Sequence, residues 1–282
     1  MSFFLATFPL SIVFFTIYLG VVGFCLFTNL MFTILIIILM LTGCIDISPL
    51  FRIADKVFGH LFKDTIARIS KNIRESFPVY GNLSYDKQAI YILHPHGTFS
   101  LSHTFHIAAK LTDWPRKDIK AVLHSLMLIT DLVPKVFNQK FVSSTYSSIR
   151  EALKEGDSIS MCMGGPREAL YSKEGGMVAV VNSRKGIFKI ALEQGIPIVP
   201  VLSYGETENT KGFFNMIYRW CKIYSGVLET KIETHIGKEI EVEKIEEPTE
   251  MDIMMLRKKY LEAIQELYKE TSPAHYDELE IM

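Results

Sequence analysis

The first 45 residues contain no Asp, Glu, Lys, Arg or His, and this uncharged stretch constrains the fold more than any other feature. Of these 45 residues, 33 belong to the apolar class. A helix needs about 20 apolar residues to cross the hydrocarbon core of a bilayer, so the stretch is too long for one span and suits two. We predict a membrane-embedded helical hairpin over 1–45, with limbs at 3–19 and 26–42.

A cleaved secretory signal does not explain this stretch, because no basic residue precedes it and it is longer than the apolar part of a signal. A buried hairpin inside a soluble protein is the alternative. The following segment, 46–75, is rich in Lys and Arg, and the positive-inside tendency therefore places the domain after it in the cytosol. Apolar residues recur in this segment at helical spacing, which predicts an amphipathic connecting helix that lies on the membrane or packs against the domain.

The rest of the chain has the composition of a globular domain. All 30 basic and 31 acidic side chains fall after residue 45. Their near balance argues against a protein that binds nucleic acid through clustered basic charge. The four cysteines are scattered, without CxxC or zinc-type spacing, which favours a reduced domain that faces the cytosol. We expect one domain over 76–282.

Short β-type runs alternate with helical patterns along this domain. The expected strands are 89–93, 119–123, 158–163 and 196–202, and the expected helices are 98–111, 147–154, 186–193 and a last helix from a Thr249 cap to about residue 270. This alternation predicts an α/β fold with a mixed, partly parallel sheet flanked by helices. Ligands bind beyond the carboxyl ends of strands in such sheets, so we expect 94–97, 164–168 and 203–206 to converge.

The motif His94-Pro95-His96-Gly97 directly follows the first expected strand. Pro95 fixes its own φ and Gly97 permits an unusual φ, so the two imidazoles are held in a rigid turn. Imidazole has an ordinary pKa near 6.5 and suits proton abstraction at neutral pH. A turn with a purely structural role is the alternative.

The histidines in this part of the chain also raise the question of a metal. His94, His96, His103 and His106 form an HxH plus HxxH cluster of a kind that binds zinc. No Asp or Glu follows closely, and Pro95 between two of the ligands restricts their approach, so we expect no metal. His103 and His106 share a helical face and are expected to be structural.

Two further segments carry candidate binding groups. Gly164 and Gly165 follow a strand, where glycine N–H groups can approach an oxyanion, and Glu168 is placed to orient an imidazole or to favour a helix N-terminus. Arg184 and Lys185 open a helix and suit phosphate groups, although a solvated basic face has the same pattern. Neither GxSxG nor a Walker motif is present, which excludes serine-hydrolase and P-loop interpretations.

The order of these motifs resembles the diacylglycerol acyltransferase type-2 family, which includes monoacylglycerol and wax-alcohol acyltransferases. The resemblance rests on Phe77-Pro78, HPHG at 94–97, GGPREAL at 164–170, RKGIFKIALEQGIPIVPVLSYGE at 184–206 and the closing run at 235–268. It covers nearly the whole chain, the uncharged hairpin included. It implies a glycerolipid acyltransferase-like fold with the catalytic domain over 76–282.

The resemblance also implies an activity and a location. Acyl-CoA is the co-substrate, no cofactor is required, and the acceptor is the hydroxyl of a neutral lipid. We expect diacylglycerol as the acceptor, with monoacylglycerol or a long-chain alcohol as alternatives. The implied location is the endoplasmic reticulum membrane, with the catalytic domain toward the cytosol, or lipid droplets. A homo-oligomer is left open.

The family pattern assigns roles to the motif residues. His96 is the expected general base and His94 supports it. The expected oxyanion donors are Gly97, Gly164 and Gly165, and the expected acyl-CoA ligands are Arg184, Lys185 and Lys189. Phosphate-directed acyltransferases pair such a histidine with an Asp in an HxxxxD motif, but Phe99 and Leu101 occupy the corresponding positions here. Glu168 is therefore our candidate for the acidic partner.

Two interpretations from other classes stay open at this point. A membrane-bound, metal-dependent lipid hydrolase would use the histidine cluster for its metal. A catalytically silent, membrane-anchored lipid-binding protein would bind acyl-CoA without turnover.

Overall fold

The computed structural model describes residues 71–81, 87–97, 100–116, 118–128, 140–207 and 231–282, all within one compact unit. The predicted hairpin at 1–45 and most of the connecting segment 46–75 lie outside the described residues. In the described ranges, no helix combines the length and the apolar character needed to cross a membrane.

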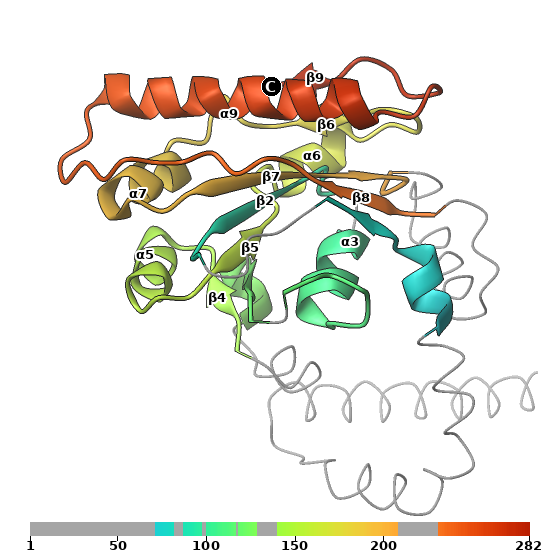
Figure 1. The fold of residues 1–282 in the computed structure, drawn as a ribbon, viewed down its shortest axis with the longest axis horizontal. Coiled ribbons are helices and arrows are strands. Elements are labelled where there is room, and N and C mark those ends of the chain that lie inside the picture. Colours follow the sequence, from blue (N-terminus) through green and yellow to red (C-terminus); the bar gives the residue numbers. More distant parts are fainter. Residues whose placement is uncertain (1–70, 82–86, 98–99, 117, 129–139, 208–230) are drawn as a thin grey trace, which may run out of the picture. The chain divides into compact units, whose positions relative to one another are not determined.

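A seven-stranded sheet forms the centre of this unit (Figure 1). In spatial order its strands are β1 (Val79–Tyr80), β8 (Glu233–Ile236), β7 (Ile198–Tyr204), β2 (Ile90–His94), β5 (Ile159–Met161), β3 (Lys120–Leu123) and β4 (Val142–Ser143). Neighbouring strands are parallel except β7 and β8, which are antiparallel. The mixed, partly parallel sheet predicted from the strand–helix alternation is confirmed.

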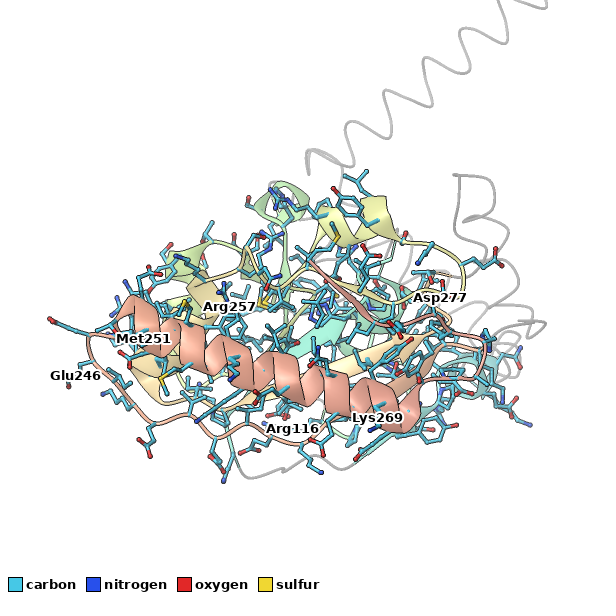
Figure 2. All side chains as sticks on the ribbon, turned by 90° about the horizontal axis from the view of Figure 1, so that it is seen from above. Arg116, Glu246, Met251, Arg257, Lys269 and Asp277 are labelled. Atoms are coloured by element: carbon cyan, nitrogen blue, oxygen red, sulfur yellow. The ribbon has the colours of Figure 1, made fainter. Side chains whose placement is uncertain are left out.

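Helices lie on both sides of the sheet (Figure 1). The helical elements are α3 (Leu101–His103), the π-helical turn η1 (Thr104–Ala108), the 3-10 turn η2 (Ser125–Leu128), α5 (Tyr146–Lys154), α6 (Pro166–Tyr171), α7 (Gly186–Gln194) and α9 (Glu250–Thr271). One apolar cluster joins α5, α7 and α9 to the sheet, and a second joins η1 to its other face. Seen from above, α9 runs across the molecule from Met251 to Lys269 (Figure 2).

Strand β2 lies near the middle of the sheet, and all five of its residues are buried. Ile90 and Ile92 belong to the cluster on the α9 side, whereas Tyr91 and Leu93 belong to the cluster on the η1 side. Side chains alternate between the faces of a sheet, so His94 lies on the same face as Ile90 and Ile92. The strand thus directs the first histidine of the HPHG turn toward α9.

Two helix boundaries that depend on local chemistry are confirmed. The side chain of Thr249 accepts a hydrogen bond from the Asp252 backbone N–H, and the Asp252 carboxylate accepts one from Thr249 in return, which makes a capping box at the start of α9. Gly195 ends α7 in the left-handed region with φ 68°. Glycine adopts this conformation without the steric cost that a Cβ would bring.

The helix predicted over 98–111 differs from what forms. Ser100 has φ 44°, which lies outside the right-handed helical region, so regular helix begins only at Leu101. After one turn the backbone widens into η1 at Thr104. The apolar spacing predicted a helical segment correctly but not its start or its internal widening.

Several short strands were not anticipated by the sequence pattern. They include β1, β4, β8, and the pair β6 (Val178–Ala179) and β9 (Glu280–Ile281), which form a second, two-stranded sheet. Runs of two to four residues are too short for their periodicity to separate strand from loop. The β6–β9 pair holds the C-terminal end of the chain beside the segment that follows α6.

Candidate active site

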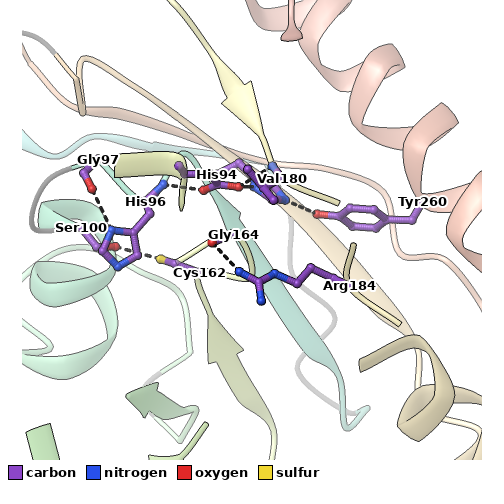
Figure 3. A network of polar contacts seen from close by, with 10 residues as sticks. His94, His96, Gly97, Ser100, Cys162, Gly164, Val180, Arg184 and Tyr260 are labelled. Atoms are coloured by element: carbon purple, nitrogen blue, oxygen red, sulfur yellow. Dashed lines mark hydrogen bonds and ion pairs between the residues drawn. The ribbon is translucent and has the colours of Figure 1, made fainter. Parts of the chain in front are cut away.

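The three polar segments expected to converge do so at the carboxyl ends of β2, β5 and β7. Strands β2 and β7 are in register, with His94 opposite Leu202. Glu168, from the segment after β5, contacts the HPHG turn, and Glu206, from the segment after β7, contacts the start of α3. These contacts confirm the convergence and define a candidate active site around the turn (Figure 3).

The His94 ring is fully buried, and both of its nitrogens are bonded. Its Nδ1 lies 2.6 Å from Oε1 of Glu168, and its Nε2 lies 3.0 Å from the hydroxyl of Tyr260 (Figure 3). The Glu168 carboxylate accepts a hydrogen bond from Nδ1–H, and Nε2 therefore accepts one from the Tyr260 hydroxyl. His94 therefore links the turn to α6 and α9, and its ring is sealed from any ligand.

Glu168 is also fully buried, and it accepts bonds from two backbone N–H groups besides the His94 ring. His96 N–H donates to Oε2 over 2.7 Å, and Val180 N–H donates to Oε1 over 2.9 Å. These donors satisfy the hydrogen-bonding capacity that a carboxylate must keep when it is buried. The sequence placed Glu168 beside an imidazole. The structure places it on the His94 ring and on the His96 backbone.

The His96 ring is only partly buried and has a different set of contacts. Its Nδ1 lies 2.7 Å from the carbonyl oxygen of Gly97. Because a carbonyl oxygen only accepts, Nδ1 carries the proton, and Nε2 presents its lone pair. Within the described part of the chain, no hydrogen bond engages His96 Nε2. Of the four ring nitrogens in the HPHG turn, this is the one without a hydrogen bond among the described residues.

Two glycines of these loops, Gly97 and Gly164, leave no room for a side chain. Gly97 has φ 56°, and a Cβ there would lie 2.9 Å from Cγ of Glu206. A Cβ on Gly164 would lie 2.0 Å from the carboxyl carbon of Glu168, so the acid folds directly over this residue. Gly165 has φ 58°, and its N–H donates to the Cys162 carbonyl over 3.2 Å.

The three basic residues predicted to bind acyl-CoA have different surroundings. Arg184 donates from Nη2 to the carbonyl of Gly164 over 2.7 Å (Figure 3). Its Nε is buried and has no partner among the described residues. Lys185 is exposed and pairs with Glu250 at 2.6 Å, and Lys189 lies 3.9 Å from Glu193. Arg184 thus contacts the glycine loop of the site, and the two lysines project from the start of α7 toward solvent.

His103 and His106 are buried next to the site, and the structure gives both a structural role. His103 Nε2 donates to the Ser160 carbonyl over 3.1 Å, and burial lowers the pKa of His103 to about 4. His106 lies between the hydroxyls of Thr112 and Thr234, at 2.7 and 2.9 Å. The expectation that these histidines are structural is confirmed.

Among the residues that the structure describes, no group of three or more His, Cys, Asp or Glu side chains is arranged to hold a metal ion. Cys162 instead makes a short contact with Ser100, its Sγ lying 2.8 Å from the hydroxyl oxygen. Burial, together with the nearby Glu168 and Glu206 carboxylates, raises the pKa of the Cys162 thiol, so the group stays protonated.

Sequence reasoning missed two residues of this arrangement, Tyr260 and the carboxylate of Glu206. Tyr260 lies on the buried stripe of α9, where the neighbours one turn away, Leu256 and Ile264, are aliphatic. A tyrosine in an apolar stripe needs a hydrogen-bond partner for its hydroxyl, and that need is the signal the sequence offered. For Glu206, the sequence predicted that segment 203–206 lies at the site, but it did not indicate which groups the carboxylate binds.

Comparison with known proteins adds the following similarities. A family model described as "Diacylglycerol acyltransferase" matches residues 28–227 and 210–277. A diacylglycerol O-acyltransferase 2 from Xenopus tropicalis is 25% identical over 234 residues, which is 69% of this chain and 65% of that protein. The chain thus matches less than two thirds of that relative's length.

Two other known proteins are similar to this chain. An acyl-CoA wax alcohol acyltransferase 2 from Homo sapiens is 24% identical over 240 residues, covering 71% of this chain and 72% of that protein. The solved structure of a 1-acyl-sn-glycerophosphate acyltransferase from Thermotoga maritima covers 76% of this chain and 92% of its own, with 15% identity and a TM-score of 0.44.

Proposed function

Because the chain belongs to the diacylglycerol acyltransferase family, we propose that it transfers a fatty acyl group from acyl-CoA to the hydroxyl of a neutral lipid, with diacylglycerol as the acceptor. The observation that carries this proposal is the state of the two HPHG histidines. His94 is buried with both nitrogens bonded, whereas His96 presents Nε2 at a partly exposed position. A base with a free lone pair is what an acceptor hydroxyl needs.

In the proposed reaction His96 acts as general base. Its Nε2 takes the hydroxyl proton while the lipid oxygen bonds to the thioester carbonyl carbon. The carbon–sulfur bond then breaks, and the proton on Nε2 passes to the departing CoA thiolate. The reaction forms one ester and frees CoA, without a covalent acyl-enzyme. The Nδ1–H bond to the Gly97 carbonyl supports this role, because it fixes the tautomer and the ring direction.

His94, Glu168 and Tyr260 are positioning residues in this scheme. Glu168 holds the His96 backbone through the 2.7 Å bond, and His94 and Tyr260 hold Glu168 in place from the α9 side. Fixing the base in advance lowers the entropy that the reaction would otherwise lose in orienting it. None of the three side chains needs to touch substrate.

The oxyanion of the tetrahedral intermediate requires N–H donors near His96. The Gly165 N–H is already used by the Cys162 carbonyl, so we assign the oxyanion to the N–H groups of Gly97 and Gly164. Both glycines lie against buried carboxylates that fix their position. Preorganised donors of this kind stabilise developing charge at little reorganisation cost.

The phosphates of acyl-CoA are assigned to the start of α7. Arg184 contacts the site loop, and the exposed Lys185 and Lys189 lie within the next turn of the chain. Helix N-termini favour anions, and Arg and Lys add charge to that preference. A phosphate at Lys185 would replace its ion pair with Glu250, which costs little because the pair is exposed.

The acceptor and the location complete the proposal. Monoacylglycerol and long-chain alcohols are the alternative acceptors. The similarity to a wax alcohol acyltransferase supports the long-chain alcohol as one of them. The uncharged stretch over 1–45 supports a membrane anchor, and the basic segment after it supports a cytosolic domain at the endoplasmic reticulum or lipid droplets. A glycan on the Asn82 sequon would contradict this orientation.

The activity is tested with membranes that carry the full chain, labelled oleoyl-CoA and one acceptor at a time. Labelled triacylglycerol formed from diacylglycerol supports the proposal. A labelled ester formed instead from monoacylglycerol or fatty alcohol would identify that lipid as the acceptor. Membranes with His96→Ala serve as the negative control, and His275→Ala, which removes an exposed ring, as the matched positive control. If no ester forms and a chelator-sensitive release of fatty acid from a lipid is seen, the protein is a metal-dependent hydrolase and the proposal is wrong.

A further inference from the structure

We propose that Glu206 is a second positioning residue for His96, which it holds through Gly97 and the start of α3. The proposal rests on the proposed acyl transfer, with His96 as its base. Glu206 follows β7 and is only 1% exposed, although it carries a carboxylate. A carboxylate at such depth requires strong donors around it, and the identity of those donors indicates what it does.

The first contact of Glu206 is with the start of α3. Its Oε1 accepts a hydrogen bond from the Leu101 N–H, and its Oε2 accepts one from the Ser102 N–H over 3.0 Å. The residue at the usual capping position, Ser100, makes no side-chain cap bond. Glu206 therefore supplies, from a strand distant in sequence, the acceptor that the first N–H groups of a helix need.

The second contact of Glu206 is with the HPHG turn. A Cβ built on Gly97 would lie 2.9 Å from Cγ of Glu206 and 3.3 Å from its Oε1, so the acid packs directly against this glycine. The Gly97 carbonyl is the group that accepts the His96 Nδ1 proton. Glu206 thus touches the chain on both sides of the connection between His96 and α3.

The segment that carries Glu206 is itself fixed. Gly205 has φ 82°, and a Cβ there would lie 2.2 Å from the Lys231 carbonyl oxygen. The Gly205 N–H donates to the hydroxyl of Tyr276 over 2.6 Å. Glu206 consequently has a defined place relative to β7, and β7 is in register with the strand that ends at His94.

Together the two buried acids hold the turn from its two ends. Glu168 binds the backbone N–H of His96, whereas Glu206 packs against Gly97 and binds the first two N–H groups of α3. The direction of the His96 ring depends on the Gly97 carbonyl, and we infer that this direction is lost when Glu206 is changed. Glu206 acts through His96 and Gly97, and it does not contact substrate.

The test compares Glu206→Gln with the wild type in the full-length, membrane-inserted protein. The amide has the same shape, but its one oxygen can accept from only one of the two N–H groups. Its NH2 group then faces the other N–H and cannot accept a hydrogen bond. We expect kcat to fall about tenfold, while KM for oleoyl-CoA stays within about twofold. A variant in which only KM rises, or in which kcat per folded protein is unchanged, would overturn the proposal.

The matched control is Asp252→Asn, which removes a carboxylate from the capping box of α9. It makes the same kind of change at a helix start without contacting the HPHG turn. We expect this variant to lower the thermal midpoint but to leave kcat as in the wild type. If it lowered kcat as much as Glu206→Gln does, loss of a cap anywhere would explain the effect and the proposal would be wrong.

A second measurement does not depend on turnover. Diethyl pyrocarbonate modifies an unbonded imidazole nitrogen, and mass spectrometry reads the rate at each histidine. We expect Glu206→Gln to raise the rate at His96 by about threefold, with the rate at exposed His275 unchanged. An unchanged His96 rate contradicts positioning. A wild type that forms no ester, combined with the expected change at His96, contradicts the proposed function and leaves the positioning role standing.

Discussion

The turn after β2 and the helical segment after it each carry two histidines, and they use them differently. His103 and His106, on α3 and η1, are buried, with ring nitrogens bonded to a carbonyl and to two hydroxyls. In the turn, His94 is buried and bonded in the same way, but His96 is partly exposed and shares only Nδ1. Four residues of one type, close in sequence, thus divide into three buried rings and one partly exposed ring.

Exposure together with the bonding of the ring nitrogens, and not the motif, distinguishes the proposed base His96 from the three buried histidines. An imidazole with both nitrogens occupied inside a core cannot exchange protons with a ligand, and the pKa of buried His103, lowered to about 4, keeps it neutral near pH 7. His96 lies where a turn, not a helix or a strand, presents its ring. The following predictions test this separation, starting with the largest expected effect.

The variant His96→Ala should lose catalysis and keep the fold. General-base loss typically lowers the rate by about 10²- to 10⁴-fold. The ring is partly exposed, and within the described residues its one hydrogen bond is to the adjacent carbonyl, so the thermal midpoint should change little. Turnover in membranes and thermal unfolding in detergent are the two measurements. Turnover at the wild-type level would place the base elsewhere.

The variant Glu168→Ala should lose stability as well as activity. It leaves the His94 Nδ1–H and the N–H groups of His96 and Val180 buried without an acceptor. Each unpaired buried donor costs about 1–3 kcal/mol, so we expect a loss of at least about 3 kcal/mol in the free energy of unfolding. Urea unfolding in detergent micelles measures it, with exposed Glu174→Ala as the control. Equal midpoints for the two variants would contradict the contacts described here.

Lowering the pH should destabilise the protein through His103. Its pKa is about 4 in the folded state and near 6.5 when exposed, so the unfolded chain binds more protons between these values and stability falls as the pH falls. One pKa unit corresponds to about 1.4 kcal/mol, which gives a loss of about 2 kcal/mol between pH 6.5 and pH 5. Urea titrations at pH 7 and pH 5 should show a smaller loss for His103→Gln. Identical pH dependence in the two proteins would show that His103 does not cause the loss of stability at low pH.

The smallest effect is expected for Tyr260→Phe. The change removes the hydroxyl that lies 3.0 Å from His94 Nε2 and keeps the packing of the ring. Loss of one neutral hydrogen bond costs about 1 kcal/mol, and we expect the rate to fall only a few-fold because His94 remains bound to Glu168. Tyr146→Phe, at an exposed position, is the control. A rate loss as large as that of His96→Ala would make Tyr260 part of the chemistry.

Much of the sheet was predictable because its strands are buried on both faces. The apolar runs at β2 and β7 have no polar alternation, which is typical of parallel strands covered by helices on both sides. The start of α9 and the end of α7 were predictable for a different reason. A capping box and a left-handed glycine depend on a few neighbouring residues and not on the rest of the fold.

The start of α3 was not predictable, because its cap comes from another part of the chain. Ser, Thr, Asp and Asn are the usual side-chain caps at a helix start, and Ser100 occupies that position in the sequence. The structure gives this role to Glu206, which reaches Leu101 and Ser102 from the end of β7. The absence of an HxxxxD acid in the sequence has the same explanation, since the acids that hold the turn arrive from β5 and β7.

The amino-acid sequence alone indicates the uncharged N-terminal stretch, the α/β alternation, the family and the HPHG turn as the centre of the candidate site. These features rest on composition, periodicity and short motifs, which are local properties of a chain. The tertiary structure, in contrast, sets which histidine nitrogens are bonded and which acids contact the turn. That assignment depends on donors and acceptors from three strand ends that meet only when the sheet has formed.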